Sequence, residues 1–177
     1  MTTKPQISRA AVLGAGVMGA QIAALLANAG IRVDLLDLPT DASADGRARK
    51  GRERLLGSRP PALFLPEYAE RIHPGSLDDL SCLGQAEWIV EAVVERLDVK
   101  RALLARVEEA ANAEAVISTN TSGLSVGAMA AESTASFRRR FLGVHFFNPP
   151  RLMKLVELVP GPDTDPRTVA HMRRFIE

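Results

Sequence analysis

Two side chains near the end of the chain could together transfer a proton. His145 lies in the apolar run FLGVHFF, and Glu157 lies in the apolar run MKLVELV. Residues 148–152 between them are too few for a helical crossover, so we expect the runs to pair antiparallel or to bend past each other at a sheet edge. Side by side, the carboxylate would fix the tautomer of the imidazole and raise the basicity of its other nitrogen. The pair would then be a general base for a hydroxyl proton.

Apolar residues flank both members of this pair. Phe146 and Phe147 follow the histidine, and Leu155 and Val156 precede the glutamate. We expect these side chains to exclude water and so to strengthen the pair. A single histidine in an apolar strand is also common as a hydrogen-bonded core residue, and the spacing alone does not decide between the two interpretations.

A hydroxyl group follows another apolar run. Ser122 belongs to the loop TNTSG, which comes directly after residues 115–118. Its hydroxyl could hydrogen-bond a substrate oxygen or a cofactor. Serine, threonine and asparagine are equally common in turns and as helix caps, so the local sequence leaves both interpretations open.

The elements that must position these groups begin with residues 9–37. The apolar run 10–13 predicts a buried strand, residues 21–29 predict a helix, and the apolar run 31–36 predicts a second strand. Between the first strand and the helix lies a G-x-G-x-x-G turn made of Gly14, Ala15, Gly16, Val17, Met18 and Gly19. This order of elements is the fingerprint of a dinucleotide-binding βαβ unit.

Each glycine of the turn would have its own role. Gly14 would permit the sharp turn out of the strand, Gly16 would let a pyrophosphate approach the backbone, and Gly19 would let the helix pack close to the sheet. The N-terminus of the helix would offer free N–H groups and a positive dipole end to the phosphates. The alternative is a glycine-rich turn in an α/β domain that binds no nucleotide.

Asp37 ends the second predicted strand, close to the expected offset of about 20 residues after the glycine turn. Its carboxylate would accept hydrogen bonds from the diol of the adenosine ribose. It would repel a 2′-phosphate, which favours NAD over NADP.

Strands and helices alternate from residue 9 to about 118, which predicts the fold class. We expect an α/β, Rossmann-type, doubly wound, mostly parallel sheet with helices on both faces and a late antiparallel strand pair. The further expected elements are strands over 71–76, 87–94, 115–118, 141–147 and 153–159, helices over 97–112 and 125–131, and a last helix that opens at Asp165 and Pro166. Ligands of such sheets bind beyond the carboxyl ends of the strands.

The composition limits the other classes of function. The chain has 177 residues, enough for one domain, and its 22 basic and 21 acidic residues give a net charge of +1. We therefore expect no nucleic acid partner and no membrane insertion, and we interpret the basic residues of 47–54 and 138–140 as solvated surface. Cys82 is the only cysteine. We expect no metal and a cytoplasmic protein, because no metal-ligand cluster, signal segment or membrane-length apolar run is present.

Five motifs in order give the chain a specific resemblance. They are VLGAGVMGAQIA, LLD, WIVEAVVERLDVK, STNTSGL and FLGVHFFNPPRLMKLVELVP. The chain resembles the NAD-binding domain of the L-3-hydroxyacyl-CoA dehydrogenases of fatty-acid β-oxidation. The NPPR sequence and the apolar, proline-rich segment 59–66 look most like the long fusion proteins that join this dehydrogenase to an enoyl-CoA hydratase region.

The resemblance implies a role for each matching residue. His145 matches the catalytic base of the family and Glu157 its carboxylate partner. Ser122 matches the serine that touches both substrate and nicotinamide, and Asn148 matches an active-site asparagine.

Other positions match the cofactor contacts of the family. Glu95 and Lys100 match residues that contact the nicotinamide half of NAD, Ala92 matches a backbone contact, and Asp37 matches the ribose acid. Lys50 lies in the basic segment where the family binds coenzyme A, and it is a substrate-binding candidate.

The activity implied by the resemblance is the reversible, NAD-dependent oxidation of an L-3-hydroxyacyl-CoA to a 3-ketoacyl-CoA. Two alternatives remain: a related dehydrogenase of a free hydroxy acid or sugar acid, and a non-catalytic NAD-binding module. Members of the family continue into an all-helical domain that closes the acyl cleft and makes much of a homodimer interface. We therefore expect residues 1–177 to be a single NAD-binding domain that ends in the linking helix and turns over poorly alone.

Overall fold

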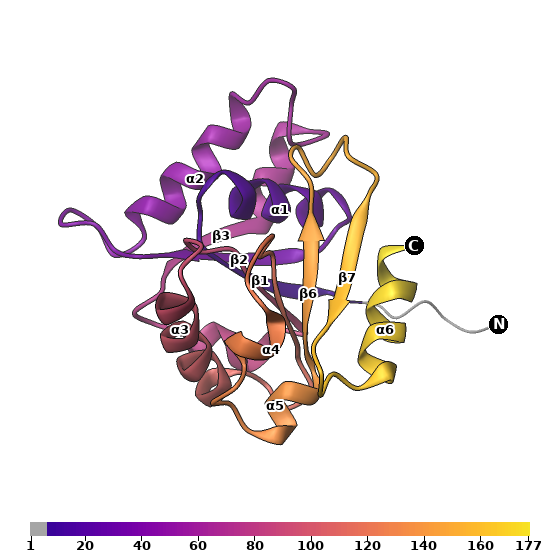
Figure 1. Ribbon diagram of the computed structural model, residues 1–177. Coiled ribbons are helices and arrows are strands. Elements are labelled where there is room, and N and C mark those ends of the chain that lie inside the picture. Colours follow the sequence, from indigo (N-terminus) through magenta and orange to yellow (C-terminus); the bar gives the residue numbers. More distant parts are fainter. Residues whose placement is uncertain (1–6) are drawn as a thin grey trace.

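A seven-stranded sheet forms the centre of the computed structural model, which describes residues 7–177. The strand order is β3-β2-β1-β4-β5-β6-β7; every neighbouring pair is parallel except β6 and β7, which are antiparallel (Figure 1). The strands are β1 (Arg9–Leu13), β2 (Arg32–Asp37), β3 (Ile72–Ser76), β4 (Trp88–Glu91), β5 (Val116–Thr119), β6 (Phe141–Phe146) and β7 (Val156–Pro160).

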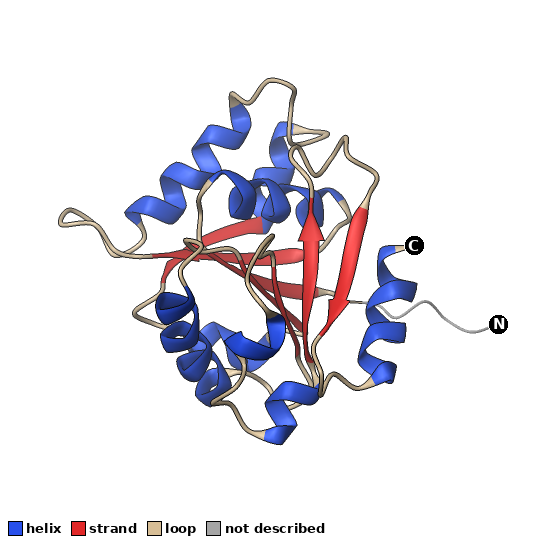
Figure 2. Ribbon diagram, in the orientation of Figure 1, coloured by secondary structure: helices blue, strands red, loops and turns tan. Residues whose placement is uncertain are grey.

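Helices cover both faces of the sheet, as the alternation in the sequence predicts (Figure 2). On one face lie α1 (Val17–Asn28), α2 (Gly46–Leu56), the 3₁₀ helix η1 (Pro66–Arg71) and α6 (Pro166–Ile176). On the other face lie η2 (Ser81–Gln85), α3 (Leu97–Ala110), α4 (Val126–Met129) and α5 (Ala135–Arg139). The predicted Rossmann-type architecture and the late antiparallel pair are confirmed. Among the described residues, no helix is both long enough and apolar enough to cross a membrane.

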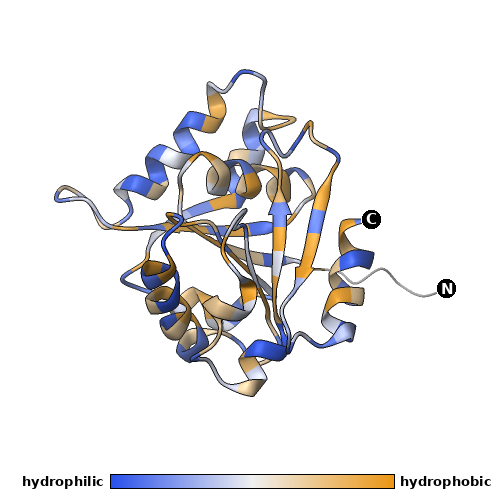
Figure 3. Cartoon of the chain, viewed as in Figure 1, coloured by the Kyte–Doolittle hydropathy of each residue, from blue (hydrophilic) through white to orange (hydrophobic). Residues whose placement is uncertain are grey.

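The apolar runs form the inner strands, which are buried on both faces. In β1 and β4, residues 10–13 and 88–91 are all buried, as expected for central parallel strands. The outermost strand β7 is half-buried to exposed, although Figure 3 shows it mostly in the orange of hydrophobic residues. The helix α2 buries only Ala48, Gly51 and Leu55 and exposes most of its charged residues to solvent.

The glycine turn joins β1 to α1 without room for side chains. Gly14 has a φ of +103°, and a Cβ there would lie 2.6 Å from the carbonyl oxygen of Ala92. A Cβ on Gly19 would lie 1.8 Å from the carbonyl oxygen of Gly14. The helix therefore packs directly on the turn and begins at Val17, four residues before the predicted start at 21.

Two strands differ by three residues from their predicted bounds at the edge of the sheet that carries the functional residues. β4 ends at Glu91 instead of continuing to residue 94, because the Glu91 carboxylate accepts a hydrogen bond from Val93 N and the chain turns away toward α3. β7 begins at Val156 instead of 153, because Met153 N donates to Pro149 O within the preceding turn.

The basic segment 138–140 is more than solvated surface. Arg138 donates to Asp163 and to Ser133 O, and Arg140 donates to Asn112 O and Ala115 O. The prediction of a solvated surface was therefore wrong for these two residues, because carbonyl oxygens at the ends of neighbouring elements need donors. The short helix α5 that carries Arg138 was not predicted, although Thr134 caps it.

Gly19→Ala should destabilise the chain strongly. The added methyl group would collide with a backbone carbonyl that cannot move without displacing β1 or α1. We expect the free energy of unfolding, measured by urea titration with circular dichroism, to fall by about 3 kcal/mol or more. Gly57→Ala is the matched control, because a Cβ there meets nothing within 4 Å and φ is −105°. Equal stability of the two variants would contradict the packing described above.

Candidate active site

Two adjoining cavities lie along the carboxyl ends of the parallel strands. The larger has a volume of about 620 Å³ and lies beside the glycine turn and the end of β2. The smaller has a volume of about 360 Å³ and lies at the ends of β4, β5 and β6. Ala92 and Val93 line both cavities, so one elongated ligand could occupy both. This is the edge at which ligands of doubly wound sheets bind.

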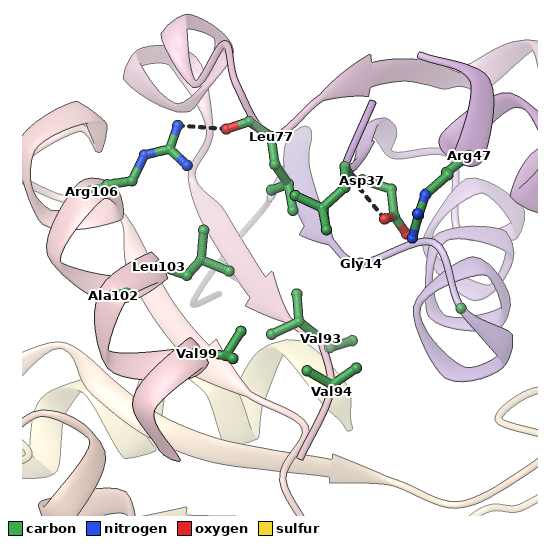
Figure 4. Close-up of a pocket in the computed structure, with 13 residues that line it drawn as sticks. Gly14, Asp37, Arg47, Leu77, Val93, Val94, Val99, Ala102, Leu103 and Arg106 are labelled. Carbon is green, nitrogen blue, oxygen red and sulfur yellow. Dashed lines mark hydrogen bonds between the residues drawn. The ribbon is translucent and has the colours of Figure 1, made fainter. Parts of the chain in front are cut away.

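The larger cavity has mostly apolar walls with polar groups at its ends (Figure 4). Val93, Val94 and Val99 line one side, and Asp37 and Arg47 lie together near the glycine turn. The walls suit a flat apolar ring, and the charged end suits the polar part of a nucleotide. The lining residues are Gly14, Gly16, Asp37, Leu38, Arg47, Leu77, Ala92, Val93, Val94, Val99, Ala102, Leu103 and Arg106.

Asp37 is already oriented by the backbone around it. Its Oδ2 accepts a hydrogen bond of 2.6 Å from Ala15 N, and its Oδ1 accepts one of 2.7 Å from Leu38 N. An ionised carboxylate has about four lone-pair sites, so acceptor capacity remains for a ribose diol. Arg54 donates to Ala15 O at 2.7 Å, so the peptide groups on both sides of Ala15 are held.

The turn leaves open space where a pyrophosphate would lie. Gly16 is exposed, and a Cβ there would meet nothing within 4 Å. The helix α1 starts without a side-chain cap and without an acidic residue in its first turn. Its first N–H groups and the positive end of its dipole are therefore available to an anion. Val17 is exposed and Met18 lines the smaller cavity. These features fit NAD.

One member of the predicted histidine–glutamate pair, His145, lines the smaller cavity. His145 and Glu157 are direct partners in the antiparallel ladder of β6 and β7, and His145 Nδ1 lies 2.8 Å from Glu157 Oε2. The histidine side chain is 18% exposed and the glutamate side chain is 50% exposed. Since Nδ1 faces the carboxylate, Nε2 is the nitrogen left for proton exchange with a ligand. His145 is only half-buried and lines a cavity, which distinguishes it from a hydrogen-bonded core residue.

The expected apolar surroundings of the pair are present on one side only. Phe146 is buried, Phe147 is half-buried, and the ring of Phe147 lies 4.5 Å from that of His145. Val156 is half-buried, but Leu155 is 56% exposed. The prediction that Leu155 excludes water was wrong for this chain, because Leu155 precedes β7 and has no element packed over it.

The loop that carries Ser122 is held by Glu95. Glu95 accepts hydrogen bonds from the Thr121 hydroxyl, from Ser122 N at 3.3 Å and from Gly123 N at 3.2 Å. Ser122 is exposed and lines the smaller cavity, as does Asn148. The cap of the following helix α4 is Ser125, whose hydroxyl accepts from Ala128 N, so Ser122 is not a helix cap.

Lys100 lines the smaller cavity, but most of its side chain is buried behind it. Its side chain is 1% exposed, and Nζ donates to both oxygens of Glu91, at 2.7 and 2.8 Å. A further oxygen, Glu95 Oε2, lies 3.3 Å from Nζ. Burial acts to raise the pKa of the Glu95 carboxyl, but hydrogen bonds from Thr121 and the charge of Lys100 outweigh it and hold this pKa below its ordinary value.

Two further polar residues belong to the site, and sequence reasoning missed the second of them. Asn120 lines the smaller cavity, and its Oδ1 accepts from Phe146 N at 2.9 Å, which ties the end of β5 to β6. Glu91 is fully buried behind Lys100. The only signal for Glu91 in the sequence is an acidic residue in an apolar strand, which is rarely buried unless paired.

Other candidates lie away from both cavities. Lys50 is exposed on α2 and lines neither cavity, so its role toward coenzyme A stays a prediction. Cys82 is half-buried, and burial raises the pKa of its thiol to about 11, which disfavours a nucleophilic thiolate. The described part of the chain contains no cluster of three or more acidic, histidine or cysteine side chains that could hold a metal ion.

The fold and the two cavities define a dinucleotide-binding domain of the dehydrogenase type. Comparison with known proteins specifies it: the family described as "3-hydroxyacyl-CoA dehydrogenase, NAD binding domain" matches residues 9–177. The chain belongs to this family, and it is an NAD-binding domain.

Individual relatives agree with the family. A "Probable 3-hydroxyacyl-CoA dehydrogenase" of Deinococcus radiodurans is 45% identical over 97% of this chain and 51% of its own length. A protein of the same description from Bacillus subtilis is 43% identical over 97% of this chain and 24% of its own length. The crystal structure of 3-hydroxybutyryl-CoA dehydrogenase from Escherichia coli superimposes with a TM-score of 0.82 at 34% identity, covering 97% of this chain and 36% of that one. The chain thus spans about half or less of the length of these proteins.

Asp37→Asn should reduce the preference for NADH over NADPH. The asparagine keeps an acceptor for Ala15 N but removes the negative charge that faces the ribose. We expect the affinity for NADH to fall by roughly tenfold, because hydrogen bonds to charged groups are worth about 1.5–3 kcal/mol. Binding of NADPH should improve relative to NADH, since Arg47 lies beside the same position.

Fluorescence titration of the chain with both reduced cofactors measures this change. Asp41→Asn, an exposed change in the loop after β2, is the control for altered net charge. An unchanged NADH to NADPH ratio in Asp37→Asn would show that the carboxylate does not set cofactor choice.

Proposed function

We propose that the chain is the NAD-binding and proton-transfer part of an enzyme that oxidises L-3-hydroxyacyl-CoA to 3-ketoacyl-CoA. The observation that carries this proposal is the 2.8 Å contact of Glu157 with His145, which lines a cavity adjoining the cavity beside the glycine turn. Membership of the 3-hydroxyacyl-CoA dehydrogenase family supports the substrate class.

The side chains in and next to the smaller cavity would each have a separate role in the reaction. His145 Nε2 would take the proton of the substrate hydroxyl, and Glu157 at Nδ1 would hold the imidazole and stabilise its protonated form. Ser122 and Asn148 line the same cavity and would position the substrate oxygen. NAD, when bound, supplies the acceptor for the hydride that leaves the substrate carbon bearing that hydroxyl group.

Residues that line the two cavities would hold the cofactor. The turn from Gly14 to Gly19 would hold the pyrophosphate, Asp37 the adenosine ribose, and Ala92 and Glu95 the nicotinamide half. Lys100 would contribute mainly through Glu95, since its ammonium group is buried between two carboxylates.

We further propose that the chain acts as part of a longer protein. Leu152, Met153 and Leu155 expose apolar side chains in the connection from β6 to β7, which begins at residues that line the smaller cavity. The chain also spans only 51% and 24% of two similar dehydrogenases. A further domain, helical as the resemblance implies, would cover this surface and close the acyl site. The linking role of α6, the homodimer, the cytoplasmic location and the fusion to a hydratase region stay predictions.

His145→Gln should abolish most turnover and spare cofactor binding. General base catalysis is worth roughly 10²- to 10⁴-fold. The kcat for 3-hydroxybutyryl-CoA oxidation in the longer protein should therefore decrease by a factor in that range. The dissociation constant of NADH should change by less than about threefold, since the glycine turn and Asp37 are untouched. His171→Gln, in α6 and outside both cavities, is the matched control. A near-normal kcat in His145→Gln would overturn the proposed role.

The chain alone should bind NADH but reduce acetoacetyl-CoA poorly. If the exposed apolar side chains between β6 and β7 are covered only in the longer protein, the acyl group is not held against the histidine in the chain alone, and loss of positioning costs about 100-fold or more in rate. The decrease in NADH absorbance at equal concentrations of the chain and the longer protein measures the difference. Similar rates would show that the described residues form the whole active site.

A further inference from the structure

A buried polar network lies behind the wall that the two cavities share. Glu91 at the end of β4 is fully buried, and Lys100 in the first turns of α3 is 1% exposed. Taking two charges out of water is costly, and buried ion pairs are often no more stabilising than apolar side chains of similar size. The pair is therefore poorly explained by stability alone, and its position beside the cavities indicates another role.

Every acceptor site of the Glu91 carboxylate is directed at a segment that borders a cavity. Oε1 accepts from Lys100 Nζ at 2.7 Å and from Val93 N at 2.7 Å, and Oε2 accepts from the Thr119 hydroxyl at 2.6 Å and from Lys100 at 2.8 Å. Lys100 Nζ also lies 3.3 Å from Val93 O. Both the N–H and the carbonyl of Val93, which lines both cavities, are thus held by this pair.

The network continues from Lys100 to the loop of Ser122. Lys100 Nζ lies 3.3 Å from Glu95 Oε2, and the other oxygen of Glu95 accepts from the Thr121 hydroxyl, Ser122 N and Gly123 N. Glu95 lies in the loop after β4 with a side chain that is 43% exposed, and Lys100 is the contact that ties its carboxylate to a residue outside the Ser122 loop. The chain of contacts therefore runs from the interior of the sheet to the serine at the cavity.

We infer that Glu91 is a positioning residue: through Lys100 and Glu95 it sets the place of the Ser122 loop at the smaller cavity. The inference rests on the proposed function, because it matters for turnover only if Ser122 positions the substrate oxygen. Glu91 itself touches neither cavity. Its carboxylate charge keeps the Lys100 ammonium group directed between two acidic side chains.

Glu91→Gln tests the inference because it keeps the size of the side chain and removes its charge. Hydrogen exchange with mass spectrometry on this chain should show amide exchange in residues 121–123 about tenfold faster than in the unchanged chain, because the amides of Ser122 and Gly123 lose their fixed acceptor, Glu95. In the longer protein kcat for acetoacetyl-CoA reduction should fall by about 10- to 100-fold, the effect of a displacement of about 1 Å. The dissociation constant of NADH should rise by a smaller factor than kcat falls, since the glycine turn and Asp37 are untouched and only the contacts of Glu95 and Val93 shift.

Ser118→Ala is the matched control. It removes a buried hydrogen bond of 2.9 Å from Trp88 Nε1 on the same two strands, and it does not touch the network. It should lower the melting temperature while leaving exchange in residues 121–123 and kcat within about threefold of the unchanged protein. If Glu91→Gln does not fold, the double variant Glu91→Gln/Lys100→Met, which leaves no unpaired buried charge, takes its place in the exchange measurement.

The outcomes separate the inference from the proposed function. Unchanged exchange at residues 121–123 in the folded Glu91 variant overturns the inference. The inference is also overturned if Ser118→Ala and Glu91→Gln lower kcat equally and lower the melting temperature equally. Both substitutions would then act through stability. If the unchanged longer protein does not reduce acetoacetyl-CoA, the proposed function fails, and the exchange measurement still decides whether Glu91 holds the loop.

Discussion

The close approach of α1 to the glycine turn is the constraint on which the cofactor site depends. The backbone at Gly19 touches the carbonyl of Gly14 so closely that a methyl group between them is impossible. This contact places the start of α1, with its unpaired N–H groups, at the mouth of the larger cavity. Asp37 and Arg54 then hold the peptide groups on either side of Ala15, so the turn is rigid before a nucleotide arrives. Such preorganisation reduces the entropic cost of binding.

The reversal of chain direction at the end of the sheet supplies the proton-transfer pair. In a parallel sheet the carboxyl ends of all strands bring loop residues to one edge, as they do for Asp37, Glu95 and Ser122. The antiparallel pairing of β7 with β6 instead places Glu157, a residue within a strand, directly opposite His145. The ladder fixes their backbone distance, so the contact does not depend on a flexible loop.

Much of this arrangement was predictable, because it follows from local pattern. The glycine turn, the acid after β2 and the alternation of strands and helices specify the doubly wound sheet, and the short connection over 148–152 specifies the antiparallel pair. The position of Lys100 was not predictable: its pairing with Glu91 depends on where β4 ends, and periodicity does not define that residue. The exposure of Leu155 was also missed, since an apolar run does not show whether another element covers it.

The order of the strands also determines how far the phosphate-binding turn lies from the histidine. Between β1, which ends in the turn, and β6, which carries His145, lie β4 and β5. Neighbouring strands are about 4.8 Å apart, so three steps across the sheet give a separation of about 14 Å. Backbone hydrogen bonds of the sheet maintain this distance, whatever the length of the surface loops. Insertions or deletions in residues 149–155 would therefore reshape the surface that follows the lining residues of β6 and leave unchanged the span that a bound dinucleotide has to bridge.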